Sequence, residues 1–92
     1  MFASQLAPLE IVLLRPEGIE EMEHAVQLLQ RHSTVVVYMA LLDDRNAQRF
    51  IDFLSGAVWS LDGSIRRVSD EVIVAAPMAI RLTSGSETEP EI

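Results

Sequence analysis

Hydrophobic positions divide the first half of the chain into strand-like and helix-like segments. The mainly apolar segment 9–14 predicts a buried strand. The Arg15-Pro16 pair ends this strand, because proline cannot donate a hydrogen bond to a sheet ladder. Residues 17–31 carry apolar side chains at helical spacing, which predicts a helix. The nearly continuous β-branched and apolar run 34–41 is typical of a central strand that is covered on both faces.

The second half of the chain predicts one more helix followed by strands. A carboxylate at Asp43 or Asp44 can cap the helix, because its oxygens accept the unpaired N–H groups of the first turn. The helical pattern then runs to about Trp59, and an Asp-Gly turn follows. Two strands joined by a short polar loop, and one further edge strand, complete the pattern at residues 65–68, 72–76 and 79–82.

This order of elements predicts an α+β fold. We expect a two-layer sandwich of order βαβαβββ, in which two helices cover one face of a mixed five-stranded sheet. The opposite face needs a cover, and in a chain of 92 residues we expect another copy to supply it. Residues 9–82 form the predicted core domain. Residues 1–8 form an N-terminal tail, and residues 83–92 have so little to bury that they predict a disordered acidic tail.

Charge and composition narrow the class of partner. The formal net charge is -7, from 14 acidic and 7 basic residues, and none of the basic residues is lysine. Nucleic acid is therefore not an expected partner, because duplex binding depends on Lys and Arg that neutralise phosphates. The chain has no cysteine, no apolar run near the ~20 residues of a membrane span and no secretory signal. These features favour a cytoplasmic protein.

Residues that could carry catalysis are sparse. His24 and His32 have no metal-ligand spacing, and the four glycines are too dispersed for a nucleotide-binding loop. Asp43 and Asp44 could in principle bind a metal, but helix capping explains them without one. We therefore predict no enzyme, no cofactor and no metal site.

The second helix has an unusual polar face. Its core stripe holds mainly apolar residues at helical spacing, namely Ala47, Phe50, Ile51, Leu54, Ala57, Val58 and Leu61. The opposite face carries Arg49, Asp52, Gly56 and Trp59, with Phe53 on its flank. A glycine inside a helix costs roughly 1 kcal/mol relative to alanine. A glycine notch beside aromatic and charged side chains favours close contact with another helix or a peptide. Alternatively, Gly56 marks the end of the helix and Trp59 packs under the following loop.

The same helix carries a motif. Residues 46–63 contain Ala-Gln-Arg-x-x-Asp-Phe-x-x-Gly and run into an Asp-Gly turn. This combination resembles the signature of the SepF cell-division family, and the segments 11–16, 35–42 and 72–77 are similar to that family's pattern as well. The resemblance covers roughly residues 9–82, the whole predicted core domain.

The resemblance implies a sandwich that forms a homodimer and can assemble into a higher polymer. It also implies recognition of the C-terminal tail peptide of FtsZ, the tubulin-like division protein, at the division septum in the cytoplasm. Carried over by position, Gln48, Arg49 and Phe53 would bind the peptide. The remaining residues of this face would serve self-association, namely Asp52, Gly56 and Trp59.

Two departures from the family pattern affect this interpretation. Tyr38 stands where family members often have asparagine, so contacts at the end of that strand can differ. Members usually begin with an amphipathic membrane-binding helix, whereas only eight residues precede the first predicted strand, which leaves membrane association in doubt. Two other functions stay open: a self-assembling scaffold that binds neither FtsZ nor membrane, and a dimeric domain that senses a small molecule.

Overall fold

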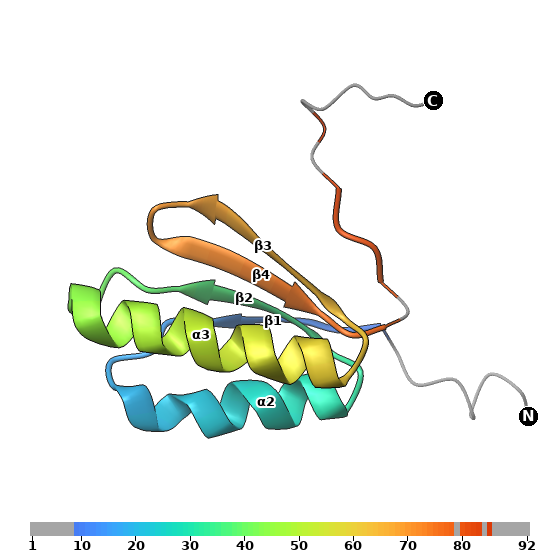
Figure 1. Ribbon diagram of the computed structural model, residues 1–92, viewed down its shortest axis with the longest axis horizontal. Helices are drawn as coiled ribbons and strands as arrows, with labels where there is room; N and C mark the ends of the chain where they lie inside the picture. Colours follow the sequence, from blue (N-terminus) through green and yellow to red (C-terminus); the bar gives the residue numbers. More distant parts are fainter. Residues whose placement is uncertain (1–8, 79, 84, 86–92) are drawn as a thin grey trace, which may run out of the picture.

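The computed structural model describes residues 9–78, 80–83 and 85. Over these residues the chain alternates strands and helices before it ends in a β-hairpin (Figure 1). The elements are β1 (Ile11–Leu14), a short 3-10 helix η1 (Ile19–Glu21), α2 (Met22–Gln30), β2 (Thr34–Tyr38), α3 (Asp44–Ser60), β3 (Ser64–Ser69) and β4 (Val72–Ala76). The predicted tail over residues 1–8, and all of the predicted tail 83–92 except residues 83 and 85, lie outside the described residues.

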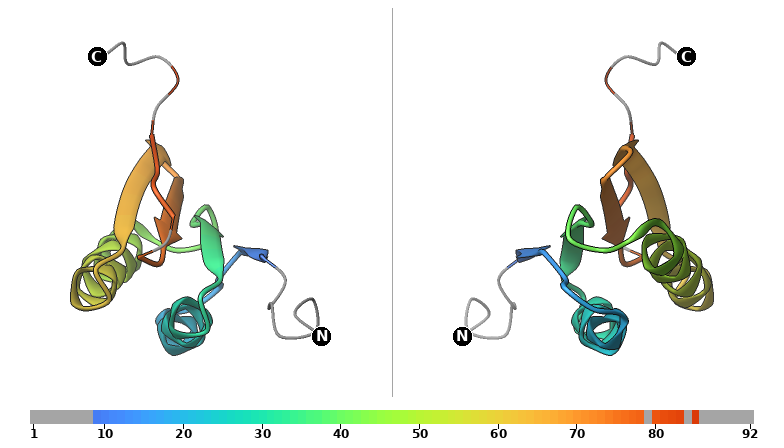
Figure 2. Two further views of the ribbon diagram at one scale, coloured as in Figure 1. Left: turned by 90° about the vertical axis from the view of Figure 1, so that its right-hand side faces the viewer. Right: turned by 90° about the vertical axis from the view of Figure 1, so that its left-hand side faces the viewer.

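The strands form one mixed sheet in the order β1-β2-β4-β3. β1 and β2 run parallel, with Val12 opposite Val35. β4 is antiparallel to both of its neighbours, and Val36 of β2 lies opposite Val74. Helices α2 and α3 lie side by side on one face of this sheet, which confirms the α+β fold with two helices in one layer (Figures 1 and 2).

The core lies between the helices and the sheet. Every other residue of the two central strands points into it, and the apolar stripes of α2 and α3 meet these side chains. The largest fully buried side chains of this layer are Leu29, Val35, Val37, Phe50, Leu54 and Ile73. The predicted core stripe of α3 is confirmed, since Phe50, Leu54 and Val58 are buried and the remaining positions are partly buried.

Local interactions fix where the elements begin and end. Asp43 is the capping residue of α3, because its Oδ1 accepts a hydrogen bond from the Asn46 N–H over 2.8 Å. At the other end, a Cβ on Gly63 would collide with the carbonyl oxygen of Ala76, so only glycine fits there. The first helix starts later than predicted, because residues 19–21 form a tighter 3-10 turn ahead of α2.

The prediction of a buried first strand was wrong. β1 is an edge strand, and Ile11 and Leu13 are 67% and 76% exposed on the side away from the helices. A continuous apolar run cannot by itself distinguish a central strand from an edge strand. β2 is central, but it is not covered on both faces, because Tyr38 is exposed on the side opposite the helices.

The described residues form four strands, not the five predicted. Residues 80–82 form no strand, and Ala79 lies outside the described residues. Pro77 ends β4, and the Ile80 N–H donates to the carbonyl of Pro77, so the chain turns there and does not pair again. Ile80 and Leu82 are half-buried, and Thr34 on the open face of the sheet is only 8% exposed.

Candidate functional site

The exposed side of α3 brings the predicted site residues together. The predicted peptide-binding residues Gln48, Arg49 and Phe53 are exposed, and Phe53 retains 47% of its exposure. The residues predicted for self-association, Asp52, Gly56 and Trp59, are exposed on the same helix. The core stripe holds α3 against the sheet, so this side of the helix is presented as a rigid surface.

Two rows of side chains run along this surface at intervals of four residues, the spacing at which helical neighbours touch. The first row is basic and then aromatic: Arg45, Arg49 and Phe53. Arg45 was not predicted as a site residue, although its spacing from Arg49 is visible in the sequence. This row offers two guanidinium groups followed by a half-exposed ring.

The second row is polar and then small: Gln48, Asp52 and Gly56. Its first two members interact, because Gln48 Nε2 donates a hydrogen bond to Asp52 Oδ1 over 2.9 Å. This bond fixes the amide of Gln48, and it occupies one carboxylate oxygen of Asp52. A Cβ on Gly56 would meet no atom within 4 Å among the described residues outside its own turn of helix. No packing contact among the described residues therefore requires a glycine at this position.

The alternative interpretation of Gly56 and Trp59 was wrong. Gly56 does not mark a helix end, because α3 continues to Ser60. Trp59 is not packed under the following loop, since its side chain is 84% exposed and borders a surface hollow with Asp62 and Gly63. A helix-interior glycine and an exposed tryptophan are both unfavourable in an isolated domain, which favours contact with another molecule.

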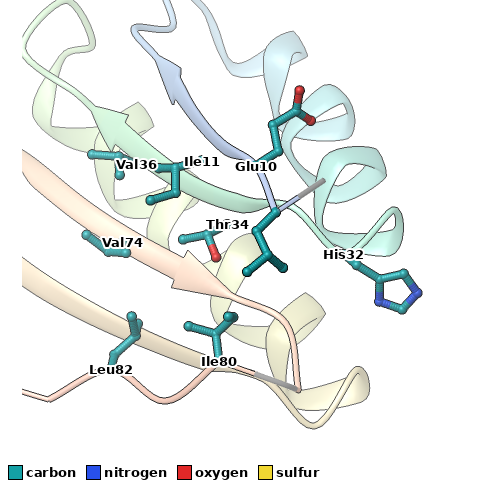
Figure 3. Close-up of a pocket in the computed structure, with 9 residues that line it drawn as sticks. Glu10, Ile11, His32, Thr34, Val36, Val74, Ile80 and Leu82 are labelled. Carbon is teal, nitrogen blue, oxygen red and sulfur yellow. The ribbon is translucent and has the colours of Figure 1, made fainter. Parts of the chain in front are cut away.

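A second candidate surface is the sheet face opposite the helices. It contains an apolar groove of about 280 Å³. Ile80 and Leu82 project toward the strands from one side, whereas the carboxylate of Glu10 and the imidazole of His32 point away from the groove (Figure 3). The residues that line it are Leu9, Glu10, Ile11, His32, Thr34, Val36, Val74, Ile80 and Leu82. Sequence patterns predicted an open face but not this groove, because the turn after Pro77 forms one of its walls.

The described residues contain no group of three or more His, Cys, Asp or Glu side chains that could hold a metal ion. His24 and His32 are both exposed, on α2 and just after it. Among the helices that the structure describes, none is long and apolar enough to cross a membrane.

Comparison with known protein families identifies a family whose model matches most of the chain. The model of the family described as cell division protein SepF matches residues 11–82. This range runs from the start of β1 through all four strands and both helices, and it includes the whole exposed surface of α3.

Curated relatives carry the same description. Cell division protein SepF of Prochlorococcus marinus strain AS9601 is 34% identical over 80 residues, which cover 87% of this chain and 42% of the relative. That of Synechococcus sp. strain CC9902 is 31% identical over 83 residues, which cover 90% of this chain and 44% of the relative. The chain therefore spans less than half the length of these relatives.

Solved structures share the fold. The SepF-like protein from Archaeoglobus fulgidus has a TM-score of 0.78 at 16% identity, over 88% of this chain and all of that one. Cell division protein SepF from Methanobrevibacter smithii, solved in complex with FtsZ-CTD, has a TM-score of 0.62 at 20% identity, over 82% of this chain and 98% of that one.

Proposed function

The chain belongs to the SepF cell-division family, and on that premise we propose that it is a non-enzymatic adaptor at the division septum, which self-associates and binds the C-terminal peptide of FtsZ. The observation that carries this proposal is the exposed side of α3. There the family motif supplies a half-exposed aromatic ring, a guanidinium group and an open glycine on one rigid helix.

Phe53 is the proposed anchor for the peptide. About half of its ring is already covered by the domain, so an apolar side chain of the peptide could bury the rest at little entropic cost. Arg49 lies one turn before it and would contact acidic groups of the peptide. Gln48 would donate or accept hydrogen bonds beside them. The complex of the M. smithii relative with FtsZ-CTD supports the choice of this ligand.

Self-association is proposed to use the neighbouring row of α3. At Gly56 the backbone is bare, so a second helix can approach closely there. Trp59 would cover apolar surface of the partner copy, and Asp52 would contribute a polar contact at the edge. Two copies related by a twofold axis would each contribute the same residues.

The open sheet face is a second proposed contact between copies. Its exposed residues Ile11, Leu13 and Tyr38 form a continuous apolar surface with the half-buried Val36 and Val74. This face lies on the layer opposite α3 (Figure 2). A copy that used both layers could join two neighbours at once, so alternating contacts would extend a dimer into a polymer.

A small-molecule sensor is less well supported than an adaptor. The groove of the sheet face is lined mainly by apolar side chains, and its Glu10 carboxylate points outward. A ligand site usually has several polar groups that converge on the ligand, and these are what a sensor would need. The described residues also hold no metal cluster that could support catalysis.

Calorimetric titration of the chain with the FtsZ C-terminal peptide tests this function. The proposal predicts saturable binding and, in light scattering, a mass of at least a dimer. Arg49→Glu should weaken binding without loss of fold, because Arg49 is exposed. No heat of binding up to millimolar peptide, with a correctly folded chain, would leave the self-assembling scaffold as the better interpretation.

A further inference from the structure

Arg45 and Arg49 form an unpaired basic pair on α3. They lie one helical turn apart, both are exposed, and neither guanidinium has a hydrogen bond or an ion pair within the part of the chain that the structure describes. Both belong to the row that continues to Phe53. Arg45 precedes the family motif, which begins at Ala47.

Local physical chemistry disfavours this pair. Like charges four residues apart on a helix repel each other. Arg45 lies in the first turn of α3, where the helix dipole favours acidic side chains. The chain carries twice as many acidic as basic residues, yet Asp52, three residues after Arg49, bonds to Gln48 instead. Residues that break several local rules at once are expected at functional sites.

We propose that Arg45 and Arg49 together bind carboxylate side chains of the partner peptide, and that they thereby set its polarity on α3. In this arrangement carboxylate side chains of the peptide lie over the start of α3, and apolar side chains of the peptide lie over Phe53. This inference rests on the proposed function, because the FtsZ C-terminal peptide is the ligand named there. Arg45 becomes a specificity-determining residue outside the family motif.

The geometry supports an acidic and apolar peptide as the occupant. Two guanidinium groups one turn apart can each hold a carboxylate with two parallel hydrogen bonds. The ring of Phe53 follows one turn later, half-covered and ready to pack against an apolar side chain. A duplex would meet only two adjacent positive charges on a chain of net charge -7, so nucleic acid does not match this surface.

The first test reverses the charge of Arg45. Arg45→Glu should leave the fold intact, because glutamate is favoured in the first turn of a helix. It should weaken binding of the FtsZ C-terminal peptide about tenfold and flatten the dependence of affinity on salt. The matched control is Arg31→Glu, which makes the same change in net charge at an exposed residue just after α2 and should leave affinity within about twofold.

Exchanging the charges of Arg45 and the peptide distinguishes a direct contact between them from a general electrostatic effect of net charge. A peptide in which lysine replaces the acidic residues should bind the parent weakly and should recover affinity with Arg45→Glu. The affinity of this peptide should not recover with Arg31→Glu. If the two chain variants changed the affinity equally, or if Arg45→Glu restored no affinity for the lysine peptide, the role of Arg45 would be overturned. Binding of the original peptide by the parent chain would still support the proposed function. Absence of binding by the parent would overturn both.

The second test measures polarity through Trp59, the one tryptophan of the chain. Arg45 and Trp59 are 14 positions apart, or about 21 Å along the helix at 1.5 Å per residue. A dansyl group placed beside the apolar side chains of the peptide should accept energy from Trp59 more efficiently than one placed beside its acidic side chains. The reverse order would contradict the proposed polarity.

Discussion

Phe50 and Phe53 lie only about 60° apart around the axis of α3, at ~100° per residue, yet their environments differ sharply. Phe50 has no exposed surface, whereas Phe53 is 47% exposed. Phe50 belongs to the core stripe, whereas Phe53 belongs to the exposed row that begins with Arg45 and Arg49. The same helix therefore holds the domain together and presents a ring to a partner.

This difference predicts separate effects on stability. Phe50→Ala should lower the free energy of unfolding by about 3–5 kcal/mol, since it opens a cavity at the centre of the core. Phe53→Ala should cost about 1 kcal/mol, because only part of its ring leaves water on folding. Urea unfolding of both variants measures the difference. Equal losses would show that Phe53 is a core residue.

Gly56→Ala should affect stability and assembly in opposite directions. A Cβ meets open space at Gly56, so alanine should stabilise the monomer by about 0.5–1 kcal/mol through its higher helix propensity. If a second helix packs on this position, the added methyl group should weaken self-association. Urea unfolding at low concentration and sedimentation equilibrium measure the two effects. Gly85→Ala, where a Cβ also meets open space, is the control and should leave self-association unchanged.

Leu13→Glu tests the open sheet face. Leu13 is 76% exposed, so a charge there should change the stability of the single chain by no more than about 0.5 kcal/mol. In a contact between two sheet faces the same charge would be buried without a partner, and the larger assemblies should dissociate. Leu41→Glu, at an exposed residue in the loop before α3, is the matched control. Identical sedimentation profiles for the two variants would exclude this face as a contact.

The sequence predicted α3 well because local signals agree along its whole length. The cap at Asp43, the apolar stripe around Phe50 and the exposed position of Trp59 all follow from helical periodicity and side-chain chemistry. The pairing of strands that are distant in the sequence could not be predicted in the same way. Nothing local in residues 9–14 shows that β1 lies at the edge of the sheet, because strand order depends on contacts distant in sequence.

The wrong prediction of a fifth strand and the missed site residue Arg45 have similar causes. The fifth strand was predicted from apolar residues after Pro77, but the hydrogen bond from Ile80 to Pro77 makes a turn that the apolar pattern does not reveal. Arg45 was not predicted as a site residue, because it lies outside the motif at residues 47–56. Its exposure and its lack of a partner within the described residues become visible only in three dimensions.

Calorimetric titration of Phe53→Ala with the FtsZ C-terminal peptide tests whether the exposed side of α3 is the surface that binds this peptide. Loss of a buried aromatic anchor costs roughly 2 kcal/mol or more, so the peptide should bind about thirtyfold more weakly than it binds the parent. Val68→Ala, a truncation of an exposed apolar residue on β3 that belongs to neither proposed contact, should bind like the parent. A folded Phe53→Ala variant with the parent's affinity would show that the peptide binds elsewhere than on this side of α3.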